Sequence, residues 1–69
     1  MNTKMRLLPS YLHTTLATLE ALGVLEGLRT LHGAELDKRA RMLAHSSRGR
    51  LHVGDILDLV GWLQVAAAL

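Results

Sequence analysis

The sequence predicts an all-α protein, a small two- or three-helix bundle that homodimerisation completes. Three observations predict this fold: leucine and alanine dominate the apolar residues, apolar side chains recur at spacings of three and four, and the last fourteen residues are almost entirely apolar. Leucine and alanine favour helix over strand, and the spacing gives each helix one apolar face. A 69-residue chain forms one domain at most, and a domain of this size is only marginally stable alone.

The segment over residues 56–69 is the main reason to expect a second chain. Its clearly polar residues are Asp58 and Gln64, so a helix there has almost no polar face. Fourteen residues rise about 21 Å as a helix, which is too short for a hydrocarbon layer of about 30 Å. We therefore expect protein to cover this helix, either a second copy of the chain or another protein. The predicted interface residues are Leu59, Trp62, Leu63 and Val65.

The chain divides into a predicted flexible N-terminal arm over residues 1–8 and a single helical domain over residues 9–69. Pro9 and Ser10 mark the first helix start, since proline is tolerated in a first turn and serine is a good N-cap. Apolar residues then recur at helical spacing, at Leu12, Leu16 and Leu19.

Gly23 interrupts this stripe, and two interpretations fit. Either Gly23 ends one helix and Val24 begins another, or a single helix over about residues 10–32 is kinked near Gly23. Glycine inside a helix costs only about 1 kcal/mol relative to alanine. We therefore favour the single helix, with Gly33 as its C-terminal stop.

Two more helices are expected after Gly33. The first covers about residues 34–45, because Leu36, Ala40 and Leu43 form an apolar stripe. Residues 46–50 form the clearest loop in the sequence. The last helix follows, with Asp55 in its first turn, where a carboxylate interacts favourably with the helix dipole.

Five of the eight basic residues cluster between positions 38 and 50. A basic helix end with an adjoining loop can bind phosphates or an acidic partner. The alternative is a solvated basic face that keeps an apolar protein soluble. No aromatic residue is interleaved in the cluster to stack on bases, which counts against nucleic-acid binding. The residues of this cluster are Lys38, Arg39, Arg41, Arg48 and Arg50.

The stretch over residues 45–57 resembles the end of a histone fold. That family ends its long middle helix, places a basic residue in the following loop, then an apolar residue, and then an Asp-Ile or Asp-Val pair that opens the last helix. The matching positions are Arg48, Leu51, Asp55 and Ile56. The resemblance covers thirteen residues. It implies an obligate handshake dimer with a long central helix through Gly27 and Gly33, and DNA contact through Arg48 and Arg50.

Several function classes find no support in the sequence. There is no cysteine, so disulfides and thiolate metal sites are excluded. The four histidines lack the close helical spacing of a metal-binding pair, and no nucleophile comes with an orienting group and an oxyanion hole. We therefore expect no catalytic, metal or cofactor site, and we expect no membrane role, since the last helix is short and lacks a basic amphipathic face.

The resulting hypothesis is a non-enzymatic protein-interaction module of the cytoplasm. It acts as an adaptor, a chaperone-like protein or an inhibitory regulator, whose apolar helices bind a partner protein and a second copy of the chain. The alternative is a nucleic-acid-binding helical dimer, either histone-fold-like or a transcriptional regulator, that uses the basic segment over residues 38–50.

Overall fold

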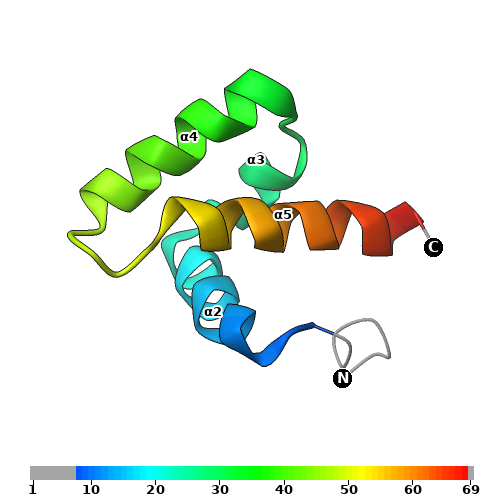
Figure 1. Ribbon diagram of the computed structural model, residues 1–69, viewed down its shortest axis with the longest axis horizontal. Helices are drawn as coiled ribbons and strands as arrows, with labels where there is room; N and C mark the ends of the chain where they lie inside the picture. The colour runs from blue at the N-terminus through cyan, green and yellow to red at the C-terminus, as the bar shows by residue number, and fades with distance from the viewer. Residues whose placement is uncertain (1–7, 69) are drawn as a thin grey trace.

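The last helix runs through the middle of the molecule, with the other helices arranged around it (Figure 1). The computed structural model describes residues 8–68. Within that range there are four α-helices, one 3-10 turn and no strand, so the all-α prediction is confirmed, with more and shorter helices than expected. The elements are η1 (Ser10–Leu12), α2 (His13–Leu22), α3 (Leu25–Arg29), α4 (Gly33–Ser46) and α5 (Val53–Ala68).

The single helix expected over residues 10–32 is wrong, because the chain turns at Gly23. Gly23 has φ +73, a left-handed conformation that glycine adopts without steric cost. Its N–H donates to Glu20 O at 3.0 Å, and the Val24 N–H donates to Leu19 O at 3.2 Å. This pair of bonds is the Schellman motif that ends helices. The interpretation in which Gly23 ends one helix and a second follows is the correct one.

Gly33 begins a helix instead of ending one. The helix before it, α3, stops at Arg29, and Gly33 is the first residue of α4, with φ +56. The helix predicted over residues 34–45 is confirmed, since α4 spans Gly33–Ser46. Its stripe points inward, with Leu36 and Ala40 buried and Leu43 partly buried.

The last helix is also confirmed, and its own chain covers much of its surface. α5 contacts α4, α3, α2 and η1, and Asp55 lies in its first turn as expected. It buries one apolar stripe along its length: Ile56, Leu59, Val60, Leu63 and Ala66. The chain exposes 4790 Å², near the roughly 4300 Å² typical of a folded monomer of this mass. The fold thus closes a core within one chain, and homodimerisation stays a prediction.

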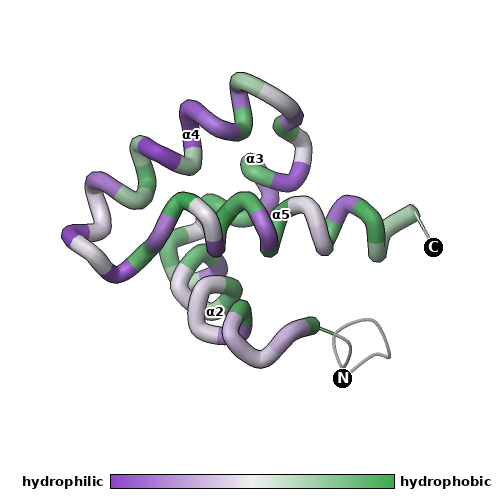
Figure 2. Tube along the Cα trace, in the orientation of Figure 1, coloured by the Kyte–Doolittle hydropathy of each residue, from purple (hydrophilic) through white to green (hydrophobic). Residues whose placement is uncertain are grey.

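Apolar and polar residues alternate along the helices so that the apolar sides meet at the centre (Figure 2). Leucine makes up most of this core, with contributions from every helix. Of the predicted N-terminal arm, residues 1–7 lie outside the described residues. Leu8 belongs to the core, with only 4% of its surface exposed.

The long central helix that the histone-fold resemblance implies is not present. The residues that would form it are divided between α3 and α4, with Thr30, Leu31 and His32 between them. The resemblance therefore extends only to the loop after α4 and the start of α5. Over residues 8–68, no helix combines the length and the apolar character needed to cross a membrane.

Candidate functional site

One side of α5 and the η1 turn form a shallow surface hollow, which we call the α5–η1 face. Tyr11 is 59% exposed and Val65 is 65% exposed, although both are large and apolar or aromatic. Trp62 lies between core and surface, partly buried against the core cluster. The residues that line the face are Pro9, Tyr11, Leu12, Leu57, Asp58, Gly61, Trp62 and Val65.

Among the described residues, Asp58 is the charged group that lines this apolar face. The Tyr11 hydroxyl donates a hydrogen bond to Asp58 Oδ2 at 3.1 Å, which joins η1 to α5. This hydrogen bond, with desolvation and the nearby charges of Asp58 and Asp55, raises the pKa of Tyr11 above its usual 10.0. The face therefore combines an apolar and aromatic surface with a negative edge.

The four predicted interface residues of α5 divide between the inside and the outside of the fold. Leu59 and Leu63 belong to the core, with Leu59 fully buried, so a partner that docks on this fold does not meet them. Trp62 and Val65 lie on the α5–η1 face. Helical geometry separates them because neighbouring positions along a helix point about 100° apart.

A tight turn after α4 positions two arginines. The Ser47 hydroxyl donates to Ala44 O at 2.7 Å and accepts from the Leu51 N–H at 2.9 Å, which closes the turn. Leu51 is buried and anchors the end of the turn in the core. Arg48 has φ +54, an uncommon conformation for a residue other than glycine. Arg48 and Arg50 thus project from a well-defined turn instead of a loose loop.

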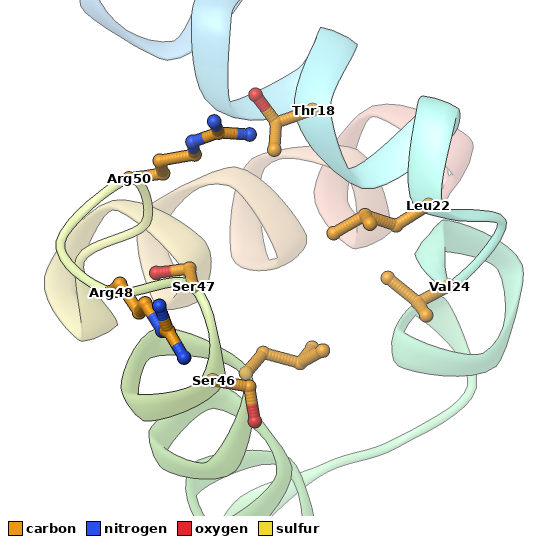
Figure 3. A pocket seen from close by; sticks show the side chains of 8 residues that line it. Thr18, Leu22, Val24, Ser46, Ser47, Arg48 and Arg50 are labelled. Atoms are coloured by element: carbon orange, nitrogen blue, oxygen red, sulfur yellow. The ribbon is translucent and has the colours of Figure 1, made fainter.

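These arginines border a hollow of about 640 Å³ between α2, the start of α3 and the end of α4. Figure 3 shows Leu22 and Val24 on one wall, with Arg48 and Arg50 coming from the loop across from them, and Arg50 extending toward Thr18. Leu22 is 57% exposed although it is apolar. The volume falls within the usual range for ligand sites, about 300–1,000 Å³.

A second hollow lies next to the first, and Val24 is a lining residue of both. Arg39 of α4 borders this second hollow, opposite the apolar side chains of α3. We call the two hollows together the arginine groove. Its lining combines five aliphatic and three basic side chains: Leu22, Val24, Leu28, Leu31, Leu43, Arg39, Arg48 and Arg50.

The predicted basic cluster is thus divided by the fold. Arg39, Arg48 and Arg50 border the arginine groove. Lys38 and Arg41 are exposed on α4 and line neither of its hollows. Arg41 is engaged locally, in an ion pair with Asp37 at 2.8 Å.

Over residues 8–68, no group of three or more histidine or acidic side chains is placed to hold a metal ion. The Ser47 hydroxyl is committed to the turn by its two backbone hydrogen bonds. What both surfaces offer chemically is apolar contact with an adjacent charge.

Sequence reasoning missed Tyr11, Leu22 and Val24 as surface-forming residues. The single helix favoured over residues 10–32 contains Leu22 and Val24, whereas the helix end at Gly23 places both at a bend. Tyr11 meets Asp58 across 47 positions of sequence, and no local pattern signals that contact.

Comparisons with known proteins do not relate this chain to a family. No protein-family model, no curated protein and no solved structure matches the chain.

Proposed function

We propose that this chain is a non-enzymatic protein-binding module that docks a partner protein on its α5–η1 face. The observation that carries the proposal is the solvent exposure of Val65 and Tyr11 in the same hollow as a partly buried Trp62. Tryptophan and tyrosine are the residues most often found at binding hot spots. Exposed apolar residues that are gathered together, unlike scattered ones, mark interaction sites.

The composition of the face defines the partner's chemistry. Over residues 8–68, Asp58 is the single charged residue of its lining, and Asp55 lies near enough to act on Tyr11. No basic residue contributes to the lining within the described part of the chain. Charge complementarity therefore favours a segment that presents an apolar side chain beside a lysine or arginine.

Gly61 supports close docking on this face. It lies within α5, and a methyl group added there would meet nothing within 4 Å beyond its chain neighbours and the backbone of its own helix. Alanine would thus fit and would favour the helix. A glycine at this position keeps the floor of the face low, which lets a partner approach the helix backbone.

The test is a selection of random peptides displayed on phage against the immobilised protein. We expect enriched peptides with an apolar residue next to a basic one, and we expect Trp62→Ala to weaken their binding about 30-fold or more. If all selected peptides bind Trp62→Ala as tightly as the wild type, the α5–η1 face is not the docking site.

Two controls separate docking from folding. Val65→Ser changes a side chain that is 65% exposed. It should therefore weaken the binding of the same peptides without lowering the melting temperature of the protein. Lys38→Gln alters an exposed charge outside both surfaces and should leave binding unchanged. Light scattering over a range of protein concentrations tests homodimerisation, and a monomer with an intact face would show that the partner is a different protein.

A further inference from the structure

The arginine groove combines apolar walls with uncompensated positive charge. Among residues 8–68, the linings of its two hollows contain Arg39, Arg48 and Arg50 and no acidic residue. Over residues 8–68 the ion pairs are Arg29 with Glu26 and Arg41 with Asp37, so none of the three groove arginines takes part in one. The groove therefore presents a positive potential to whatever binds there.

The conformation of Arg48 adds a second observation. A non-glycine residue in the left-handed region costs about 1–2 kcal/mol. Gly49, the next residue, also has a positive φ of +91. An arginine in a position where glycine or asparagine would be less strained is the kind of outlier that accompanies function. The strain places a guanidinium at the edge of an apolar hollow, next to Arg50.

We propose that the arginine groove binds an acidic, apolar-anchored segment of a partner protein. An apolar side chain of the segment packs between Leu22, Val24 and Leu43, and its carboxylates pair with Arg48 and Arg50. Arg39 extends the positive border past Val24 for a further carboxylate. Arginine suits this task because its planar guanidinium pairs with a carboxylate through two hydrogen bonds.

The lining favours a peptide over a nucleic acid. Single-stranded nucleic acids are held by aromatic side chains that stack on bases, and neither Trp62 nor Tyr11 lines the groove. The walls are aliphatic, which suits leucine-type anchors at helical spacing. This inference does not depend on the proposed function, since the groove and the α5–η1 face have no lining residue in common.

The experiment repeats the phage-displayed peptide selection and sorts the enriched peptides by which variants of the protein weaken their binding. In the peptides that bind the arginine groove, called groove peptides, we expect aspartate or glutamate next to a large aliphatic residue. Arg50→Gln should weaken the binding of these peptides about tenfold or more. Leu22→Ser should also weaken their binding, and Trp62→Ala should not change it. Raising the salt concentration from roughly 0.05 to 0.5 M should weaken the binding of these peptides about tenfold.

The matched control is Lys38→Gln, which removes the same charge from α4 outside the groove and should leave these peptides unaffected. Groove peptides without acidic residues, or acidic peptides that bind Arg50→Gln as tightly as the wild type, would overturn the proposal. A fluorescent DNA duplex and a single-stranded RNA serve as competing probes. If either binds through Arg48 and Arg50 more tightly than every acidic peptide, the groove is a nucleic-acid site instead.

Discussion

The α5–η1 face and the arginine groove are built from the same kind of helices but carry opposite chemistry. The face contains the chain's tyrosine and tryptophan and one acid, Asp58. The groove contains aliphatic side chains, hydroxyl residues and arginines, and no acid or aromatic residue from the described part of the chain lines it. Both are apolar surfaces at the edge of one leucine core. The charge at the border, more than the apolar area, therefore distinguishes what each can bind.

The largest expected effect tests whether one side of α5 packs in the core while another side forms the α5–η1 face. Leu59→Ala should lower the free energy of unfolding by about 2–5 kcal/mol, because Leu59 is fully buried. Val65→Ala on the same helix should change it by less than about 0.5 kcal/mol. Urea denaturation measures both. Equal effects would mean that Leu59 is not a core residue of the single chain.

The next effect sharpens the description of the groove. Arg48→Gly should raise the free energy of unfolding by about 1 kcal/mol, because glycine relieves the left-handed strain. The matched variant Arg50→Gly should lower it, since Arg50 has no positive φ and glycine only adds unfolded-state entropy. Thermal unfolding followed by circular dichroism measures both. A loss of stability in Arg48→Gly would show that the strain is absent.

A smaller gain should follow from Gly61→Ala, beneath the α5–η1 face. Added helix propensity should stabilise the fold by about 0.5–1 kcal/mol, and we expect weaker binding of Trp62-dependent peptides. Gly27 in α3 also has open space beside it, so Gly27→Ala should stabilise the fold without changing the binding of those peptides. Melting temperatures measure the stability of both variants, and peptide affinities measure the binding. Tighter face binding by Gly61→Ala would contradict close docking.

The smallest effect concerns the negative edge of the face. The raised pKa of Tyr11 means that its contribution to stability is fully present below the usual 10.0 and is lost as pH rises through the higher folded value. Asp58→Asn should bring the pKa of Tyr11 down toward 10.0. Ultraviolet absorbance of the phenolate measures it without ambiguity, because the chain has one tyrosine. An unchanged titration would mean that Asp58 does not hold the hydroxyl.

Local sequence pattern predicted the helices best where their ends were marked. The spacing of Leu36 and Ala40 predicted α4, and the apolar run over residues 56–69 predicted α5. The error at Gly23 arose because glycine is tolerated within a helix as well as at its end. Which of the two occurs depends on where the following chain must pack.

The candidate surfaces were only partly predictable for a related reason. Trp62 and Val65 were predicted as interface residues and lie on an exposed face, but Leu59 and Leu63 were assigned to the same interface and lie in the core. The sequence shows that α5 is apolar on nearly every side. It does not show which side the remaining helices will cover, because that depends on contacts distant in sequence.

The polar residues of α5 show the same division. Gln64 donates from its side-chain amide to Leu31 O at 2.9 Å and Arg29 O at 3.1 Å, and so ties α5 to the end of α3. Asp58 accepts from Tyr11 and ties α5 to η1. In the sequence these two residues only interrupt an apolar run, whereas in the fold each satisfies polar groups of a distant segment.

The sequence by itself determined an all-helical chain, the positions of α4 and α5, and a basic cluster around the turn between them. These follow from local quantities, namely helix propensity, the spacing of apolar residues and the composition of a turn. The tertiary structure alone decided that α5 is covered by its own chain and that three arginines border one groove. Long-range packing sets both, because the same apolar stripe can be buried against a second copy or against the chain's own helices.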